Sequence, residues 1–496
     1  MRSEDGAFRT AFIVCSALAL VPLWIGRYLP MVDMPQHAAQ VAIWRDWNQT
    51  ALGYSTAYWA DWFTPYLLAY GLAWLFSWFV GALVGVKLVV TLAILALPRM
   101  VLRLLRHFGG DPWWSLLAFP VAFGYSFGWG FFSFIVAIPI ALWALELTFR
   151  HGRERSARSA SLLAVVITLL FFAHILLWGF VGLVAGAVLL VEAGSLRRAA
   201  KAWLPLLPSV PLAVIWMRLL QSPLEDLPPR PTQWLMGWNR VLEGPALILG
   251  MKPTLWVTAV GLLILVFPFM LGGRPVRAPA RWIPFAAALV LYLFVPHYVF
   301  YTAYVGQRFS VLIVPCLLIG LTLRHQPTPR QRRLLAGLVV LWLGSLGVRA
   351  WGAKLEADPL HALFEQIEPG SKLLYMSFNR DSDFFSWPLY HHSGAWYQVE
   401  QGGLMDFSFA SFLVPPFSYR PDQEPHLPRL MSWGPTVQDW VRREGGEHWD
   451  YFLIRVPKGE GSRPPASPQW AEPVAADPPW WLFRRRVEGG ANVGDP

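Results

Sequence analysis

Long uninterrupted apolar runs are the feature of this sequence that most restricts its fold. Several of them reach or pass the ~18–20 residues that a helix needs to cross a bilayer. Hydrophobic residues make up 55% of the 496 residues, and charged residues only 15%. This pattern excludes disorder, a collagen-like fibre, a coiled coil and a disulfide scaffold. It predicts a polytopic membrane protein built from α-helices.

Basic clusters between the apolar runs indicate how the chain crosses the bilayer. Lys and Arg outnumber Asp and Glu by 41 to 31, a net charge of +10. In a membrane protein such an excess collects in cytoplasmic loops, so we expect no nucleic-acid partner. Alternation predicts about eleven transmembrane helices, with the N-terminus inside and the C-terminus outside. The predicted spans are 7–29, 83–105, 113–125, 131–149, 161–176, 178–193, 203–220, 255–271, 282–294, 309–323 and 335–348.

The segment 64–79 is apolar but does not fit this alternation as a span. Counting it would place Arg99, Arg103 and Arg106 outside, against the positive-inside rule. We therefore expect an interfacial helix at 64–79. It follows an outer loop, 30–63, whose residues 38–47 suit an amphipathic helix in the headgroup region. A second long outer loop is predicted at 221–253.

The chain changes character after residue 352. Residues 353–496 are rich in proline and charge and contain no spanning run. Short apolar pieces predict strands at 372–376, 451–456 and 481–486, and a helix is expected at 432–444. The sequence therefore predicts an all-α transmembrane domain over 1–352. A small extracytoplasmic α/β domain with a Pro-rich end is predicted over 353–496.

Polar residues inside or beside membrane spans are costly and usually functional. The predicted topology places most of them at one depth near the outer face, where a single cavity could collect them. Beside them lies a glycine-rich aromatic hairpin at 123–134. The candidates are Asp33, His37, Asp61, Lys87, His174, Arg218, His297, Gln307 and Arg308.

Asp33 has two interpretations. As an N-cap it would accept hydrogen bonds from the amides of a helix start, with Pro35 tolerated in the first turn. His37 would then lie one turn further on, on the same side. The functional interpretation is a carboxylate beside an imidazole, which can deprotonate a hydroxyl or coordinate a divalent ion. Both interpretations stay open at the level of sequence.

The cationic candidates also have two interpretations. Arg308 can extend its guanidinium to the interface, or it can hold a lipid-linked phosphate bidentately. Lys87 and Arg218 are further candidates for that phosphate, although a lone interfacial lysine is the plainer interpretation of Lys87. The other pocket candidates are Asp61, His174, His297 and Gln307. No Walker loop, CxxC pair or HExxH motif is present.

The layout resembles the multi-spanning GT-C glycosyltransferases, which include protein mannosyltransferases and the aminoarabinose transferases of lipid A. The resemblance rests on an early aspartate in a long first outer loop, an interfacial segment, many spans and an outer C-terminal domain. In detail, segments 33–37, 127–134, 307–309 and 391–403 look like those of uncharacterised bacterial members. Better-known members often carry two adjacent acidic residues, where this chain has Asp33 alone.

The resemblance implies a transferase of the cell (inner) membrane. It would move a sugar from a polyprenyl-phosphate donor to a glycan, lipid or protein acceptor on the extracytoplasmic face. Asp33 would act as the base or as a metal ligand, with His37 beside it if a divalent cation such as Mg or Mn binds. Arg308, Lys87 and Arg218 would hold the donor phosphate.

Two other classes of function stay open. A transporter or flippase would favour charged sites near the bilayer midplane and internal repeats. In this chain the charges gather at the outer ends of the spans and no repeat is visible. The other class is a non-catalytic membrane assembly protein that presents the outer domain.

Overall fold

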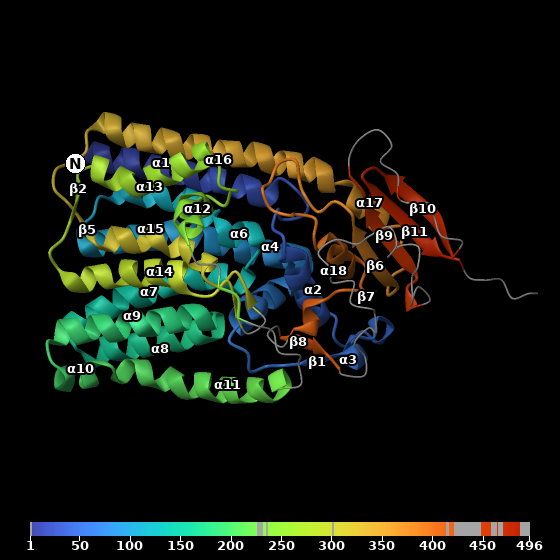
Figure 1. Ribbon diagram of the computed structural model, residues 1–496, viewed down its shortest axis with the longest axis horizontal. Helices are drawn as coiled ribbons and strands as arrows, with labels where there is room; N and C mark the ends of the chain where they lie inside the picture. The colour runs from blue at the N-terminus through green and yellow to red at the C-terminus, as the bar shows by residue number, and fades with distance from the viewer. Residues whose placement is uncertain are drawn as a thin grey trace, which may run out of the picture.

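The computed structural model describes residues 2–225, 232–234, 237–299, 302–412, 416–420, 448–457, 464 and 470–486. Figure 1 shows a helical bundle whose members run along the long axis of the molecule, with a small sheet-containing domain at one end. The opposite end carries the start of α1 (Arg2–Trp24) and a two-stranded sheet of β2 (Gly273–Pro275) and β5 (Leu321–Leu323).

Within the described residues, five helices are long and apolar enough to cross a membrane. These are Gly6–Trp24, Leu67–Phe108, Phe132–Glu154, Ile175–Ala193 and Pro329–Phe364. A pair bent by 51°, Leu196–Ala202 with Leu204–Leu219, makes a sixth if it is one span. Shorter apolar helices are Ala157–Ala173, Leu255–Met270, Pro279–Phe294 and Gln307–Ile319. The chain is a multi-pass membrane protein, while the count of about eleven spans and their orientation stay predictions.

The predicted span 113–125 is wrong as a single helix. The chain there forms a 3-10 helix η2 (Pro112–Leu117), a short α5 (Ala118–Ala122) and, after Gly124, α6 (Tyr125–Trp129). Proline lacks an amide donor and its ring clashes with the preceding turn, so Pro112 and Pro120 favour short helical pieces. Every residue of the segment is buried, so it belongs to the interior of the protein.

The helix α4 (Leu67–Phe108) contains a sharp break at Gly81, where φ is +80° and ψ is 161°. Only glycine adopts this conformation readily. Beyond the break the two halves pack closely, because a Cβ on Gly85 would lie 2.7 Å from the Ala73 carbonyl oxygen. The first half corresponds to the predicted interfacial helix at 64–79. Its position at the membrane surface stays a prediction.

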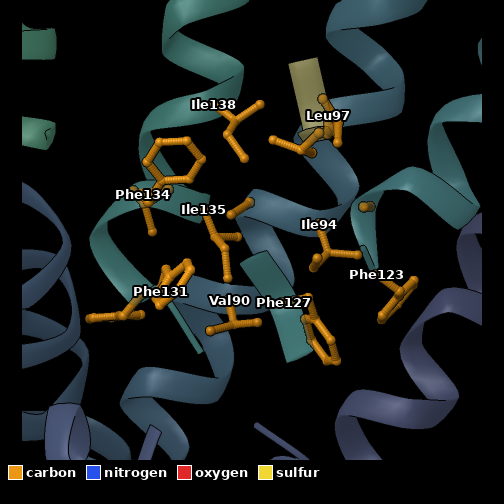
Figure 2. Packing of buried hydrophobic residues seen from close by; sticks show 14 of the residues in the cluster. Val90, Ile94, Leu97, Phe123, Phe127, Phe131, Phe134, Ile135 and Ile138 are labelled. Carbon is orange, nitrogen blue, oxygen red and sulfur yellow. The ribbon is translucent and has the colours of Figure 1, made fainter. Parts of the chain in front are cut away.

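The core of the bundle surrounds α7 (Phe132–Glu154). In its most apolar stretch 89% of the residues are buried, so this helix contacts protein rather than lipid. It packs against α4, α8 (Ala157–Ala173) and α9 (Ile175–Ala193). Figure 2 shows the aliphatic side chains of α4 and α7 meeting aromatic rings from the segment between them, among them Phe127 and Phe131.

The helix α2 (Met34–Arg45) lies between the bundle and the C-terminal domain (Figure 1). Nine of its twelve residues are buried, so the predicted amphipathic surface helix at 38–47 is wrong. Gln36 Nε2 donates to the Phe407 carbonyl at 3.0 Å, and the Phe417 amide donates to Gln40 Oε1 at 3.1 Å. The two glutamines therefore bind backbone of the C-terminal region, while the small alanines between them allow close packing.

Both predicted outer loops contain structure that joins them to other parts of the chain. In the first loop, η1 (Thr50–Leu52) and α3 (Tyr54–Ala57) precede β1 (Tyr58–Ala60). β1 pairs antiparallel with β8 (Phe417–Tyr419), so this loop shares a sheet with the C-terminal region. The second loop contains α12 (Trp238–Ile248), which packs against α13.

The C-terminal domain contains a five-stranded sheet of order β10-β11-β9-β6-β7. The strands are β6 (Lys372–Ser377), β7 (Leu404–Met405), β9 (Tyr451–Arg455), β10 (Ala471–Asp477) and β11 (Trp480–Arg485). The three predicted strands correspond to β6, β9 and β11 and are confirmed. The helix expected at 432–444 and much of the Pro-rich end lie outside the described residues. One helix, α16 (Pro329–Ala357), runs across the predicted boundary at 352.

The remaining elements complete the bundle and the C-terminal domain. They are α10 (Leu196–Ala202), η3 (Leu204–Ser209), α11 (Val210–Glu225), α13 (Leu255–Met270), η4 (Pro279–Trp282), α14 (Ile283–Phe294), β3 (Tyr298–Val299), β4 (Thr302–Ala303), η5 (Gln307–Phe309), α15 (Ser310–Ile319), α17 (Pro359–Phe364), η6 (Ser393–Ala395), α18 (Trp396–Glu400) and η7 (Phe409–Ser411).

Candidate functional site

The candidate site forms where the aromatic turn, residues 123–134, lies against the start of α2. The amide of Asp33 donates to the Trp129 carbonyl at 3.0 Å. Gly130 has a φ of +81°, and a Cβ there would lie 2.9 Å from the Asp33 backbone nitrogen. Another residue at 130 would push the turn away from α2, so this glycine allows the close approach that fixes the Asp33 backbone.

Asp33 stands at the N-cap of α2 but does not cap it. Its side chain makes no hydrogen bond to the amides of the first turn. The side chain is 15% exposed, and its Oδ1 lies 3.5 Å from Nε2 of His392. Burial raises the pKa of Asp33 to about 7, and the positive charge of Arg308 partly opposes this rise. The capping interpretation is therefore wrong, and the carboxylate is left for other chemistry.

His37 lies one turn into α2, as predicted, but its ring is engaged elsewhere. Its Nδ1 lies 2.6 Å from the Tyr70 hydroxyl, and the ring lies edge-on to Phe409 at 5.2 Å. Burial is the main reason that the pKa of His37 falls to about 3. The ring is therefore neutral at physiological pH. The imidazole that lies beside Asp33 is that of His392, not that of His37.

Arg308 lies in η5, directly before α15. Its guanidinium stacks on Phe131, 3.7 Å from the ring centre, and Nη2 donates to the Ala303 carbonyl at 3.3 Å. Its Nε is buried and has no hydrogen-bond partner among the described residues. Of the described carboxylates, Asp33 is the one whose charge acts on this guanidinium. A planar cation with an unpartnered N–H is suited to bind an anion.

His174 joins α8 to α9 and reaches the same turn. Its Nδ1 accepts a hydrogen bond from the Leu176 amide at 3.2 Å and so caps α9. Its ring lies edge-on to Tyr66 at 4.9 Å and to Phe134 at 5.1 Å. It is thus a buried, hydrogen-bonded histidine at the wall of the site, with one nitrogen already used.

Four positions of the aromatic turn each contact one predicted residue. The pairs are Gly130 with Asp33, Phe131 with Arg308, Phe132 with His37 and Phe134 with His174. The turn therefore gathers side chains from α2, from the α8–α9 junction and from the start of α15. Asp33, His174 and Arg308 thus each lie against this turn, while the single outer cavity that the sequence predicts for them stays a prediction.

His297 and Gln307 pair with each other, with Gln307 Nε2 2.9 Å from His297 Nδ1. Tyr304 connects the pair to the turn, because its ring lies 4.8 Å from His297 and 4.4 Å from Trp129. Gln307 Oε1 is buried without a hydrogen-bond partner among the described residues. The pair therefore borders the site and adds an unsatisfied acceptor to it.

Lys87 is positioned for a different role from the predicted one. Its Nζ donates to the Gly26 carbonyl at 2.8 Å and lies over the Trp24 ring. It thus binds the chain just after α1. Among the described contacts none joins Lys87 to Arg308, and a role of Lys87 at the donor phosphate stays a prediction.

Arg218 and Asp61 also lie apart from the turn. Arg218 is exposed on α11. Asp61 accepts a hydrogen bond from the Phe63 amide at 2.9 Å, which fixes a local turn. No described contact brings either residue to the group around Arg308, so the structure does not join them to the candidate site.

Sequence reasoning assigned no role to His392. It is buried, and burial is the main reason that its pKa lies well below the usual value, with His391 and other cations nearby adding to the effect. The segment 391–403 had stood out by resemblance. The residues around His392 contain no pattern that predicts its position beside Asp33 in the fold.

The predicted divalent-cation site does not fit the residues present. Within the described parts of the chain, no three or more His, Cys, Asp or Glu side chains are grouped so that they could hold a metal ion. The ligands expected from the sequence are Asp33 and His37, and Nδ1 of His37 is already paired with the Tyr70 hydroxyl. We therefore route no chemistry through a metal.

Comparison with known proteins gives a fold relationship. No protein-family model and no curated protein matches the chain. Among solved structures, it is similar to the cryo-EM structure of arabinofuranosyltransferase AftD from Mycobacteria, with a TM-score of 0.51 and 15% identity. The match covers 97% of this chain and 40% of AftD, so the chain spans about two fifths of that protein. A mutant AftD structure matches at a TM-score of 0.48 and 14% identity, covering 96% and 41%.

At this level of identity the likeness shows the fold. The fold of AftD is therefore shared over nearly the whole chain, and membership of the GT-C glycosyltransferases stays a prediction. The more specific resemblance to protein mannosyltransferases and aminoarabinose transferases stays a prediction.

Proposed function

We propose that this protein is an integral membrane glycosyltransferase, which transfers a sugar from a polyprenyl-phosphate donor to an acceptor on the extracytoplasmic face. The observation that carries the proposal is the half-buried carboxylate of Asp33, which caps no helix and lies beside His392 and in the field of Arg308. The fold shared with AftD, a protein named as an arabinofuranosyltransferase, supports the same class of reaction.

Asp33 is the proposed general base. An acceptor hydroxyl oxygen attacks the anomeric carbon of the donor sugar, while the bond from that carbon to the phosphate oxygen breaks. The hydroxyl proton passes to Asp33, whose pKa of about 7 suits a base that works near neutral pH. Positive charge builds on the sugar ring in an oxocarbenium-like state. The phosphate leaves as an anion, so no strong general acid is required.

Arg308 is the proposed binding group for that phosphate. The guanidinium is held against Phe131 and keeps an unpartnered Nε, so it can donate to phosphate oxygens without first breaking an ion pair. Charge on the leaving phosphate grows as the glycosidic bond breaks. A fixed cation therefore stabilises the transition state more than the bound donor.

His392 is the proposed positioning residue for Asp33. Its Nε2 lies 3.5 Å from Oδ1 of Asp33, and such contacts tighten when substrate binds. A neutral imidazole can donate an N–H to the carboxylate and orient it without cancelling its charge. The C-terminal domain would thus complete the site rather than only recognise the acceptor.

The test is a transfer assay with purified protein in proteoliposomes. The first donor is polyprenyl-phosphate arabinofuranose, because the structural neighbour is named for that sugar; other polyprenyl-phosphate sugars follow. Asp33→Asn keeps the shape of the side chain and removes the base, so we expect the rate to fall by about 10²–10⁴-fold. Asp61→Asn is the matched control and should retain activity.

Equal transfer by wild type and Asp33→Asn would remove Asp33 from its proposed role. No transfer from any polyprenyl-phosphate sugar by folded wild-type protein would reject the function itself. In that case, measured movement of intact lipid-linked sugar between leaflets would identify the transporter alternative.

A further inference from the structure

A polar hollow lies at the end of α2 that is remote from Asp33. It has a volume of about 480 Å³, within the range of roughly 300–1,000 Å³ typical of small-molecule sites. One side comes from the end of α2 and the loop after it, and the other from the break in α4. The lining residues are Arg45, Asp46, Asn48, Gln49, Ser77, Trp78, Phe79 and Gly81.

The polar side of the hollow is organised and close to neutral. Arg45 donates from Nε and Nη2 to the two carboxylate oxygens of Asp46, at 2.9 and 2.6 Å. Gln49 Nε2 donates to the same carboxylate at 2.8 Å. Because the guanidinium and the carboxylate cancel, this wall offers hydrogen-bonding groups without net charge. It suits a neutral ligand rich in hydroxyls better than an anionic headgroup.

The other side of the hollow presents aromatic rings. Trp78 is 61% exposed and Phe79 is 80% exposed. Trp78 is held by an edge-on contact with Trp74 at 6.0 Å, and Trp74 stacks on Trp44 at 5.0 Å. A sugar ring has an apolar C–H face and a rim of hydroxyls. An aromatic ring opposite amide, carboxylate and guanidinium groups matches both parts.

We propose that this hollow binds a sugar unit of a neutral oligosaccharide. The α2 helix separates it from Asp33 by twelve residues, which is ~18 Å at the rise of an α-helix. A short glycan could therefore rest one sugar in the hollow while its end reaches Asp33. The identification of this glycan as the acceptor rests on the proposed function, whereas the binding itself does not.

The experiment applies labelled protein in lipid nanodiscs to an array of short neutral oligosaccharides, followed by titration with the best binder. Wild type should bind at least one of them. Trp78→Ala should weaken that binding by tenfold or more. Asn48→Ala, at an exposed position where folding is not at risk, should weaken it by at least threefold. Trp351→Ala removes another exposed tryptophan, 49% exposed on α16, and should bind as wild type does.

Absence of binding to every neutral oligosaccharide, or equal binding by wild type, Trp78→Ala and Asn48→Ala, would overturn the inference. Binding only to vesicles that contain anionic lipid would do the same. Asp33→Asn separates the two proposals, because it should bind the glycan normally and lose transfer. Glycan binding by a wild-type protein that transfers nothing would leave the hollow as a glycan site and reject the proposed enzyme.

Discussion

Two aspartates in this protein stand at the start of proline-containing helical segments, and they have opposite environments. Asp111 precedes η2, is 1% exposed, and accepts hydrogen bonds from the Trp113 amide at 2.9 Å and from Arg332 at 3.0 Å. Asp33 precedes α2, caps nothing, and has His392 at 3.5 Å as its closest ionisable partner among the described residues. The first carboxylate is fully used by the fold and the second is not.

Arg332 and Arg308 differ in the same way as the two aspartates. Arg332 binds Asp111 and also donates to Gln326 at 2.7 Å. Arg308 stacks on an aromatic ring, donates to the Ala303 carbonyl and forms no ion pair within the described structure. Burying a charge without neutralising it is costly. Asp33 and Arg308 lie near one turn without neutralising ion pairs, and this arrangement costs stability. The cost favours a role for both residues in the reaction rather than in folding.

The largest expected effect is a loss of stability when the ion pair between Arg332 and Asp111 is broken. Arg332→Met removes one partner of a buried ion pair and leaves Asp111 uncompensated, which should lower the free energy of unfolding by about 3–5 kcal/mol. Thermal unfolding in one detergent gives the comparison with wild type. Activity per folded molecule should be unchanged, and a selective loss of activity without a loss of stability would break the contrast.

Arg308→Gln should lower the activity of the protein but not its stability. Removing a fixed cation from the departing phosphate should lower kcat by about 10²–10³-fold. The unfolding temperature should change little, because no ion pair is lost. The measurement is steady-state transfer from the polyprenyl-phosphate donor. A variant that transfers normally but unfolds early would assign Arg308 to the structure of the bundle.

The pH dependence should report the ionisation of Asp33. A base must be deprotonated, so the rate should fall about tenfold per pH unit below about 7 and level off above it. Burial lowers the pKa of His37 to about 3 and lowers that of His392 as well, so neither ring should add a rising limb near pH 7. Rates measured from about pH 5 to 8 should increase with pH and fit the ionisation of a single group. A flat or falling profile would contradict the assignment.

The smallest effect is a gain of stability in Asp33→Asn. The pKa of Asp33 is higher in the folded protein than its ordinary value, so the folded state binds this proton more tightly. Stability is therefore full in acid and is lost as the pH rises through about 7. At about pH 8 the variant should be more stable than wild type by about 1–3 kcal/mol, with no gain near pH 4. Asp111→Asn should be destabilised at both pH values.

The sequence predicted the membrane class and three strands of the C-terminal sheet, and it placed Asp33 and Arg308 at one depth, where both lie against the aromatic turn. It failed on α2, because a helix rich in alanine looks the same in the headgroup region as between two protein layers. Gln36 and Gln40 show the difference only once their backbone partners are known. The span 113–125 failed because a buried apolar segment need not be one helix, and Pro112 and Pro120 favour short helical pieces there.

The sequence by itself determined the properties that belong to a single segment. These are the length of each apolar run, which must match the thickness of a bilayer, and the absence of charged residues from the middle of the run. Tertiary structure alone decided which imidazole stands beside Asp33, which cations are neutralised and where a hollow opens at the end of α2. These depend on pairs of residues hundreds of positions apart. Burial and the field of neighbouring charges, which set the behaviour of a carboxylate, exist only after those segments have packed.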